Sequence, residues 1–544
     1  MSISSTIDPA ILKEANRRRT FAIISHPDAG KTTLTEKLLL YGGCVDVAGA
    51  VRGRKTQRAA TSDWMELEKQ RGISVSSTVL SFEYEARRVN LLDTPGHQDF
   101  SEDTYRTLMA ADCAVMVIDL AKGVELQTEK LFRVCALRGL PILTFVNKVD
   151  RPGKQTLEVL DDVESKLGIE PVAFNWPIGT GHEFRGIVEV GSGTAHLFTA
   201  SGGEHRVACL SMPMQELTTN EVSEHSLMQT TDDLDLLQNA GATFDRQKFL
   251  TGKQTPVFFG SALNNFGIEH FLRGFLELCP PPSERRCDLG QLPVGRPEFA
   301  GFVFKIQANL DPRHRDRVAF VRICSGKFVR DMEATHSRTG KKIRLPRAHR
   351  LFAQDRETMD EAYPGDIVGL VNPGEFRLGD TICEGKAVNF EPLPEFPPEF
   401  FATLRCADTN RRKQYDKGLH QLVEEGAIQS FSPPGTAGNE IILAAVGQLQ
   451  FDVIQFRLES EYTTKTTLDW LPFKFVRWLP EDYSPEQKLE LSYSAKQVID
   501  RHGRWAVLFT SKWDVENTAR ENPSVRFSDI GASSFLDQEQ TASR

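Results

Sequence analysis

Three short motifs could bind a nucleoside triphosphate, and each of them directly follows an apolar run. They occupy residues 25–32, 93–97 and 147–150, in that order along the chain. The first is a loop ending in Lys-Thr, which can surround phosphates with backbone N–H groups, and the second begins with an aspartate that can hold Mg²⁺. The third ends in an aspartate that can recognise guanine. Each motif alone is a modest signal, but together they predict a guanine-nucleotide switch.

The first motif has the surroundings that a phosphate-binding loop requires. Residues 21–24 are apolar and predict a buried strand, whereas residues 33–40 predict a helix. We expect Lys31 to reach the β- and γ-phosphates and the Thr32 hydroxyl to hold Mg²⁺. Because Ser25 stands where the usual pattern has glycine, the loop alone could also be a helix start without function.

The second motif follows a predicted strand at residues 89–92. Asp93 would bind Mg²⁺ through water, and Gly96 would offer the γ-phosphate a backbone N–H with no side chain in the way. Aspartate, proline and glycine are also ordinary turn residues. This segment therefore indicates a switch only because a phosphate loop precedes it.

The third motif follows another predicted strand and would select the base. The Asp150 carboxylate can accept hydrogen bonds from both N1–H and the 2-amino group of guanine, a donor pair that adenine lacks. Asn147 can bond the base edge and nearby loops, while the Lys148 stem can pack on the purine face. A fourth segment, residues 261–263, follows a predicted strand at 256–260, and its backbone could contact the guanine O6.

The predicted nucleotide contacts come from all four segments, with Thr32 and Asp93 as metal-binding members. The expected residues are Ser25, His26, Pro27, Asp28, Ala29, Gly30, Lys31, Thr32, Thr33, Asp93, Thr94, Pro95, Gly96, His97, Asn147, Lys148, Asp150, Ser261, Ala262 and Leu263.

Composition describes a globular protein of several domains. The 544 residues are too many for one ordinary core, so three domains are expected. No apolar run approaches the ~20 residues of a membrane span, and the polar N-terminus predicts no signal peptide. Nine cysteines are scattered without a Cys-x-x-Cys pair, which suggests neither a zinc site nor a disulfide framework and fits a reducing cytoplasm.

Changes in sequence pattern predict where the domains lie. Residues 1–283 alternate strands and helices, typical of an α/β P-loop GTPase domain, with an insert at about 168–250. After a proline-rich linker, residues 296–388 show short strands with regular turns and predict a β-barrel. After a second such linker, residues 396–535 predict an α/β sandwich as the C-terminal domain, and residues 536–544 a disordered tail.

A basic run in the predicted barrel has two interpretations. It could contact the phosphates of a nucleic acid, or it could be a solvated loop. The net charge of −9 argues against a wholly basic nucleic-acid binder but leaves room for such a patch. The run consists of Arg338, Lys341, Lys342, Arg344, Arg347 and Arg350, joined by Arg313, Arg315 and Arg317.

Two features of the motifs resemble the translational GTPases. His97 directly follows the Asp-Thr-Pro-Gly sequence, and residues 71–74 read Arg-Gly-Ile-Ser after the segment 63–68. The resemblance implies that residues 71–74 belong to the first switch, where the Ser74 hydroxyl would meet Mg²⁺ only when GTP is bound. Most family members carry threonine there, so a looser switch is expected.

The same resemblance implies how GTP would be hydrolysed to GDP. His97 would position the attacking water, flanked by Ile73 and Pro27, and Asp28 could hold a monovalent cation. Phosphoryl transfer needs mostly positioning and charge stabilisation. Because no arginine finger stands out in the motifs, we infer slow intrinsic hydrolysis that the ribosome stimulates.

The length of the chain and its third domain narrow the choice among the translational GTPases. Residues 445–451 resemble the third domain of elongation-factor-G-like proteins. Too few residues follow that domain for the transfer-RNA-like arm of the translocases, and elongation factor Tu has a second barrel instead. The resemblance is to the peptide chain release factor 3 family, and it is weakest in residues 203–237 and in the tail.

Membership would imply a monomeric, cytoplasmic GTPase of translation termination. Its partners would be the ribosome, through ribosomal RNA and proteins, and class-I release factors, whose release and recycling it would promote in a stop-codon-independent way. No membrane or DNA partner is expected. The chain has no Gly-Gly-Gln triplet, which the ester-cleaving factors carry, so we expect no cleavage of peptidyl-tRNA. Another ribosomal GTPase, or a module that switches without catalysis, stays open as an alternative.

Overall fold

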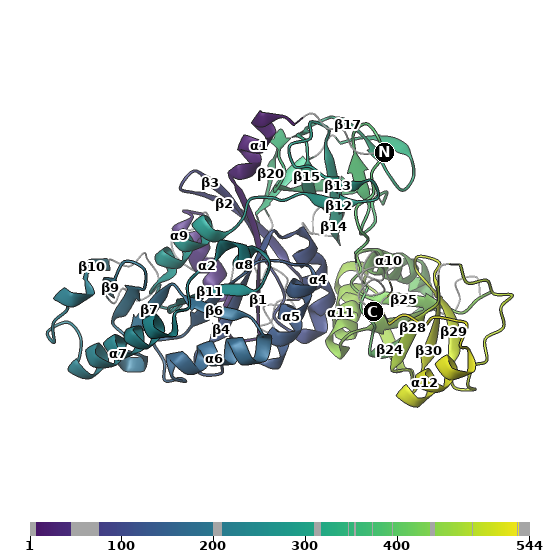
Figure 1. Ribbon diagram of the computed structural model, residues 1–544. Helices are drawn as coiled ribbons and strands as arrows, with labels where there is room; N and C mark the ends of the chain where they lie inside the picture. Colours follow the sequence, from purple (N-terminus) through teal and green to yellow (C-terminus); the bar gives the residue numbers. More distant parts are fainter. Residues whose placement is uncertain are drawn as a thin grey trace.

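The computed structural model has three lobes along the chain (Figure 1). An α/β lobe leads into a strand-rich lobe and then into a mixed lobe, whose helix α11 (Gln448–Tyr462) lies beside the first lobe. The structure describes residues 7–44, 75–199, 209–308, 317–345, 348–352, 355–372, 374–393, 395–435, 441–480, 482–529 and 531.

The first lobe is built on a seven-stranded sheet in the order β2-β3-β1-β4-β5-β11-β6. All neighbours run parallel except β2, which pairs antiparallel with β3. The strands are β1 (Arg18–Ser25), β2 (Thr78–Tyr84), β3 (Arg87–Asp93), β4 (Cys113–Asp119), β5 (Ile142–Asn147), β6 (Glu170–Ala173) and β11 (Gln254–Phe259). Because parallel strands end at one edge, the segments that follow β1, β3, β5 and β11 meet there.

Helices cover both faces of this sheet, and successive β1 side chains alternate between them. Ala22 and Ile24 join the core under α4, α5 and α6, whereas Phe21 and Ile23 join the core under α2, α8 and α9. The helices are α1 (Pro9–Asn16), α2 (Lys31–Tyr41), α4 (Ser101–Ala110), α5 (Leu126–Leu137), α6 (Thr156–Leu167), α8 (Arg246–Leu250) and α9 (Ile268–Leu278), with the short η1 (Gln98–Phe100) before α4.

A smaller antiparallel sheet, in the order β10-β9-β8-β7, stands beside the main sheet. We call it the insert sheet. Its strands are β7 (Asn175–Ile178), β8 (Gly186–Glu189), β9 (Thr194–Phe198) and β10 (Cys209–Pro213), accompanied by η2 (Gly181–Glu183), η3 (Met214–Glu216) and α7 (Glu224–Ala240). Since β6 pairs with β11 in the main sheet, the insert sheet begins later than the boundary near residue 168 that we expected.

The second lobe is the predicted β-barrel, with strands in the order β18-β17-β23-β14-β15-β22-β19-β20. Its strands are β14 (Ala300–Ala308), β15 (Arg317–Ser325), β17 (Glu333–His336), β18 (Lys341–Arg344), β19 (Ala348–Phe352), β20 (Asp355–Thr358), β22 (Ile367–Asn372) and β23 (Thr381–Cys383). Two small ribbons accompany it, β12 (Arg285–Cys287) with β13 (Gly290–Leu292) and β16 (Phe328–Val329) with β21 (Glu361–Ala362).

The third lobe is an antiparallel sheet in the order β27-β24-β26-β25-β29-β30-β28, with α10 and α11 sharing a core with it. Its strands are β24 (Phe400–Cys406), β25 (Gln429–Ser432), β26 (Ile442–Ala445), β27 (Thr466–Trp470), β28 (Phe475–Trp478), β29 (Lys496–Asp500) and β30 (Trp505–Phe509). Its helices are η4 (Thr409–Arg411), α10 (Arg412–Glu424), α11 and α12 (Lys512–Glu521). Among the described residues, no helix is long and apolar enough to cross a membrane.

A buried ion pair joins the first lobe to the barrel. The Arg322 guanidinium donates to the Asp112 carboxylate at 2.5 Å and to the Gly365 carbonyl at 2.7 Å. The side chains of Arg322 and Asp112 are 1% and 4% exposed. Removing one member of such a pair leaves the other charge buried, so the junction depends on both.

We expect Asp112→Ala to destabilise this junction, because Arg322 would stay buried without its carboxylate at a cost of about 3–5 kcal/mol. Urea unfolding should show a lower midpoint. The exposed pair of Lys327 with Glu361 provides a control, since Glu361→Ala should change stability by less than about 1 kcal/mol. Equal effects of the two substitutions would contradict the role given to Asp112.

Candidate nucleotide-binding site

The loop between β1 and α2 is held in a shape that requires glycine. Gly30 is the N-cap residue of α2 and has a φ of +98°, a conformation that costs glycine little. A Cβ atom on Gly30 would lie 2.2 Å from the Asn147 amide nitrogen. The loop therefore approaches the end of β5 closely, and the start of α2 is available to phosphates.

Lys31 and Asp93 form a buried ion pair at the centre of this edge. The Lys31 ammonium lies 2.5 Å from Asp93 Oδ1, and both side chains are almost fully enclosed. Asp93 Oδ2 and the Ser25 hydroxyl are buried and have no hydrogen-bond partner within the described part of the chain. Buried polar atoms without partners are costly, so they mark a place where a polar ligand would be stabilised.

The Asn147 side chain joins two of the predicted segments. Its amide nitrogen donates to the Ala29 carbonyl at 2.8 Å, and its oxygen accepts from the Ala262 N–H at 2.9 Å. The ammonium of Lys148 donates to the Asp28 carbonyl and pairs with Asp119 at 2.7 Å. These bonds fix the phosphate loop relative to residues 261–263.

Asp150 has one occupied and one unoccupied acceptor. Its Oδ2 accepts from the Asn264 side-chain amide at 3.0 Å, while Oδ1 is buried without a partner in the described ranges. A carboxylate oxygen in this state can accept a hydrogen bond from a base. The geometry fits the predicted role in guanine recognition.

The second motif packs against the phosphate loop and against the third lobe. Thr94 donates its hydroxyl hydrogen to the Ile23 carbonyl at 2.6 Å. The half-buried His97 accepts from the Asp99 N–H through Nδ1 at 3.3 Å. Asp99 Oδ2 in turn accepts from the Leu449 N–H at 2.8 Å, in the first turn of α11. The second motif is thus joined to the third lobe by a direct hydrogen bond.

The barrel holds the segment that follows the predicted first switch. The Lys305 ammonium donates to the Ser76 hydroxyl at 2.7 Å and to the Ser77 carbonyl. Asp103 of α4 accepts hydrogen bonds from the N–H and the hydroxyl of Ser77. Burial alone would raise the pKa of the Asp103 carboxyl, but the nearby Lys305 charge and these hydrogen bonds hold the pKa below its usual value. Ser74 and Ile73 themselves lie outside the described residues.

The described members of the basic run do not form one free patch. Arg338 pairs with Asp380 at 2.7 Å and Arg317 with Glu424 at 2.5 Å. Residues 313, 315 and 347 lie outside the described residues, as does the side chain of residue 350. The exposed members on β18 are Lys341, Lys342 and Arg344.

Three residues of the site were missed in the sequence. Asp119 ends β4 directly opposite Asn147 in the register, so its place after an apolar run was a usable signal. Asn264 lies beside Asp150 because the turn after β11 brings it there, and its place in the sequence gives no sign of this contact. Asp99 follows His97 closely, but nothing in the local pattern indicates its partner Leu449, which lies 350 positions further along.

Comparison with known proteins assigns all three lobes. Residues 16–281 match the family described as "Elongation factor Tu GTP binding domain", residues 298–385 match "Elongation factor G domain 2", and residues 390–519 match "Class II release factor RF3, C-terminal domain". Peptide chain release factor 3 of Gloeobacter violaceus is 52% identical over 526 residues, which cover 96% of this chain and 99% of that protein. The chain belongs to the peptide chain release factor 3 family.

Further matches agree with this family. Peptide chain release factor 3 of Nostoc punctiforme is 51% identical over 530 residues, covering 97% of this chain and 98% of that protein. A crystal structure of a Thermus thermophilus protein has a TM-score of 0.65 at 24% identity, covering 89% of this chain and 72% of the other, and shows the shared fold. The chain is a GTPase and a GTP-dependent termination factor, and the predicted fold class is confirmed.

We expect Asp150→Asn to weaken GDP binding at least about tenfold and to improve binding of xanthosine diphosphate. The reason is that an amide cannot accept from both guanine donors, and hydrogen bonds to charged groups contribute about 1.5–3 kcal/mol. Fluorescence titration with labelled nucleotides would measure both affinities. The exposed Asp161 of α6 provides a control, Asp161→Asn, which should bind like the unaltered protein. Unchanged guanine preference in Asp150→Asn would refute this assignment.

Proposed function

We propose that this chain hydrolyses GTP on the ribosome during termination and uses the GTP-bound state to release class-I release factors for recycling. One observation carries the proposal. The segment that bears His97 also bears Asp99, which bonds the first turn of α11 in the third lobe. A movement of this segment at the γ-phosphate would therefore be passed directly to the third lobe. That lobe carries the match to the RF3 C-terminal domain, which distinguishes this family.

The nucleotide would use the buried atoms that have no partner among the described residues. Asp150 Oδ1 is suited to one guanine donor, and Oδ2 could exchange the Asn264 amide for the other. Lys31 would leave Asp93 to contact the β- and γ-phosphates. The remaining predicted residues of the phosphate loop and of residues 261–263 would contribute backbone groups.

Mg²⁺ fits the phosphate end of this site. Asp93 Oδ2 is a buried carboxylate oxygen without a hydrogen-bond partner among the described atoms, and Mg²⁺ prefers oxygen ligands. Thr32, Ser74 and Asp93 would hold the ion directly or through water. When bound, it neutralises charge on the β- and γ-phosphates.

His97 would position the attacking water. Its Nδ1 lies 3.3 Å from both the backbone nitrogen and Oδ1 of Asp99, so Asp99 orients the ring. The other ring nitrogen, Nε2, would then contact a water beside the phosphate loop. Stimulation by the ribosome would act on this segment, and the exposed lysines and arginine of β18 are candidates for contact with ribosomal RNA.

We place the protein in the cytoplasm, where it acts as a monomer on ribosomes that carry a class-I release factor. The absence of a Gly-Gly-Gln triplet supports release of the factor and not cleavage of peptidyl-tRNA. Recycling would be independent of the stop codon, because that codon is read by the class-I factor.

The experiment that tests this function measures turnover of a catalytic amount of class-I release factor on excess stop-codon ribosomes. Peptide release should accelerate only when this protein and GTP are both present. GTP hydrolysis on ribosomes without acceleration would indicate another ribosomal step. Peptide release without any class-I factor would contradict the absence of ester cleavage.

Gly447→Ala tests whether the contact between Asp99 and α11 is needed for this activity. A Cβ atom at residue 447 would lie 2.0 Å from Asp99 Cγ, so the contact between the second motif and α11 must open. We expect normal GDP affinity but at least about tenfold slower factor turnover, a change of about 1.4 kcal/mol in activation free energy. Gly191→Ala is the control, since nothing lies within 4 Å of a Cβ there. Unimpaired turnover by Gly447→Ala would refute the coupling through Asp99.

His97→Ala should bind GTP normally but hydrolyse it at least about 100-fold more slowly on ribosomes, since positioned groups of this kind contribute about 10²–10⁴-fold. Single-turnover hydrolysis with excess ribosomes would measure the rate. His182→Ala serves as the control and should hydrolyse GTP at the unaltered rate, because His182 is exposed in η2 of the insert. Equal rates for His97→Ala and the unaltered protein would rule out the proposed role.

A further inference from the structure

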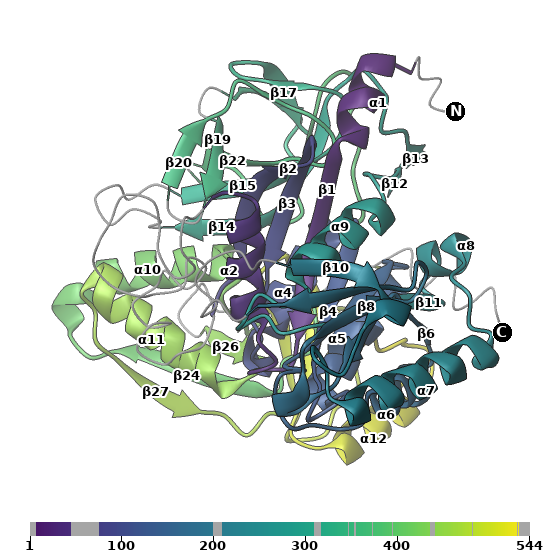
Figure 2. The ribbon, with the colours of Figure 1, turned by 90° about the vertical axis from the view of Figure 1, so that its left-hand side faces the viewer.

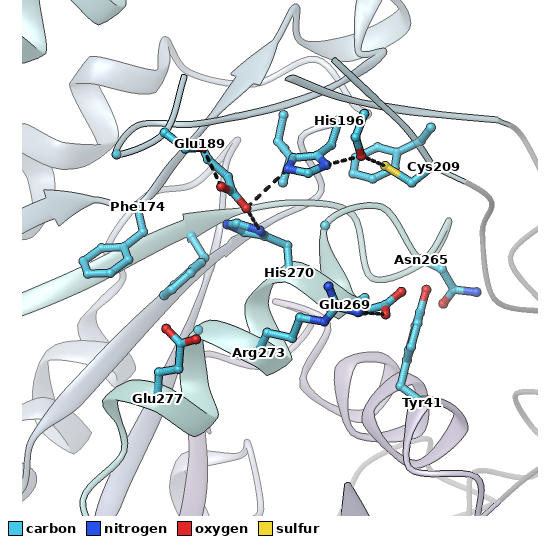
Figure 3. A pocket seen from close by; sticks show the side chains of 18 residues that line it. Tyr41, Phe174, Glu189, His196, Cys209, Asn265, Glu269, His270, Arg273 and Glu277 are labelled. Carbon is cyan, nitrogen blue, oxygen red and sulfur yellow. Dashed lines mark hydrogen bonds and ion pairs between the residues drawn. The ribbon is translucent and has the colours of Figure 1, made fainter. Parts of the chain in front are cut away.

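A cavity of about 570 Å³ lies between the insert sheet and α9, away from the predicted nucleotide contacts. Figure 3 shows that the Glu189, His196 and His270 side chains point toward one another in this cavity. Glu189 ends β8, His196 lies in β9, and His270 lies in the first turn of α9. Figure 2 shows β8 and β10 next to α9, so the cluster joins the insert sheet to a helix that covers the main sheet.

Two of the three distances in this cluster are close to those between neighbouring ligands of a tetrahedral metal ion. Glu189 Oε1 lies 3.3 Å from His196 Nε2 and 3.1 Å from His270 Nδ1. One ligand atom from each of the three residues lies within 4.8 Å of the others. Zn²⁺ binds nitrogen and carboxylate oxygen at about 2.0–2.2 Å, which places neighbouring tetrahedral ligands roughly 3.3–3.5 Å apart.

We propose that Glu189, His196 and His270 bind a divalent transition-metal ion, Zn²⁺ in the first place, with water from the cavity as the fourth ligand. Two imidazoles and one carboxylate are a donor set that Zn²⁺ uses in proteins. Imidazole nitrogen suits Zn²⁺ better than Mg²⁺, which distinguishes this cluster from the oxygen donors near Asp93.

Two of the proposed ligands are oriented by neighbours. The Ser192 hydroxyl donates to Glu189 Oε2 at 2.7 Å, which leaves Oε1 toward the histidines. The Ser211 hydroxyl bonds His196 Nδ1 at 2.9 Å, which turns Nε2 toward the centre of the cluster. That Nε2 is buried and makes no hydrogen bond within the part of the chain described. Second-sphere bonds of this kind are typical of histidine and carboxylate metal ligands.

The simpler interpretation is an ion pair between protonated histidine and Glu189. An ion pair needs only one histidine, whereas two imidazole nitrogens, His196 Nε2 and His270 Nδ1, converge on the same carboxylate oxygen. The nearby Arg273 is paired with Glu269 at 2.9 Å and does not occupy the Glu189 carboxylate among the described contacts. Cys209 lies beyond Ser211, with its sulfur 3.9 Å from that hydroxyl, and is not one of the three ligands.

A bound ion would fasten the insert sheet to α9. That helix begins at Ile268, directly after the turn in which residues Ser261 and Phe266 form a bridge. The same turn supplies the Ala262 N–H that bonds Asn147. The metal would therefore stabilise the base-binding end of the first lobe from outside, without contacting nucleotide.

The test uses the full-length protein, stripped with a chelator and then incubated with Zn²⁺ in the presence of Mg²⁺ and GDP. After desalting, elemental analysis should find one more equivalent of zinc in the unaltered protein than in the double variant H196N/H270N. The matched control is H182N/H225N, which alters two histidines of the same insert outside the cluster. Equal zinc in all three proteins would overturn the proposal, as would no zinc in the unaltered protein.

Co²⁺ provides a second readout that identifies the ligands. The unaltered protein should give the intense visible bands of tetrahedral Co²⁺, and Glu189→Gln should weaken Co²⁺ binding at least tenfold while GDP affinity stays unchanged. Cys209→Ser should leave the spectrum as it is. Loss of the bands in Cys209→Ser, or their persistence in H196N/H270N, would show a different ligand set and contradict the one assigned.

Discussion

The hydrogen bond from the Leu449 N–H to the Asp99 carboxylate connects the chemistry of the first lobe to the rest of the molecule. The N-terminus of a helix leaves backbone donors without partners, and a side-chain oxygen of the helix's own N-cap residue commonly accepts from one of them. Here the N-cap is Gly447, which has no side chain, and Asp99 of another lobe takes that role. A glycine is required because a Cβ atom would collide with Asp99. Helix α11 is therefore completed only when the second motif is in place.

The nucleotide edge is organised in the same way, by side chains that satisfy partners in distant segments. Asn147 bonds Ala29 and Ala262 at once, so neither loop can move without breaking a buried hydrogen bond. Lys31 and Asp93 neutralise each other in the described state, which avoids leaving two buried charges unpaired. Phosphate would offer Lys31 a stronger partner, and a cation would offer Asp93 one. Binding of the nucleotide and its metal ion would therefore separate this ion pair.

Local patterns in the sequence predicted the elements whose side chains are buried. Apolar runs and turn residues located β1, β3, β5 and β11 and, with them, the edge at which the motifs meet. The strand β27 gives no such signal in the sequence, because it is largely exposed and carries few apolar positions. The partnerships of Asp99, Lys305 and Asn264 were missed for a different reason, since they depend on how loops and lobes pack and leave no periodic trace in the chain.

The histidine cluster of the insert shows the limit of sequence patterns most directly. Spacing rules for metal sites rely on ligands from one hairpin or one helix, and cysteine spacing indicated no zinc site in this chain. His196 lies opposite Ile187 in the pairing of β8 with β9, so Glu189 is its diagonal neighbour on the same face of the insert sheet. His270 joins them only because α9 packs beside that sheet. Since α9 also follows the loop that bonds Asn147, the same packing that assembles the cluster positions the proposed guanine-binding end of the site. A metal ion that stabilised the contact between the insert sheet and α9 would therefore act on nucleotide recognition through the placement of this helix and not through a shared ligand.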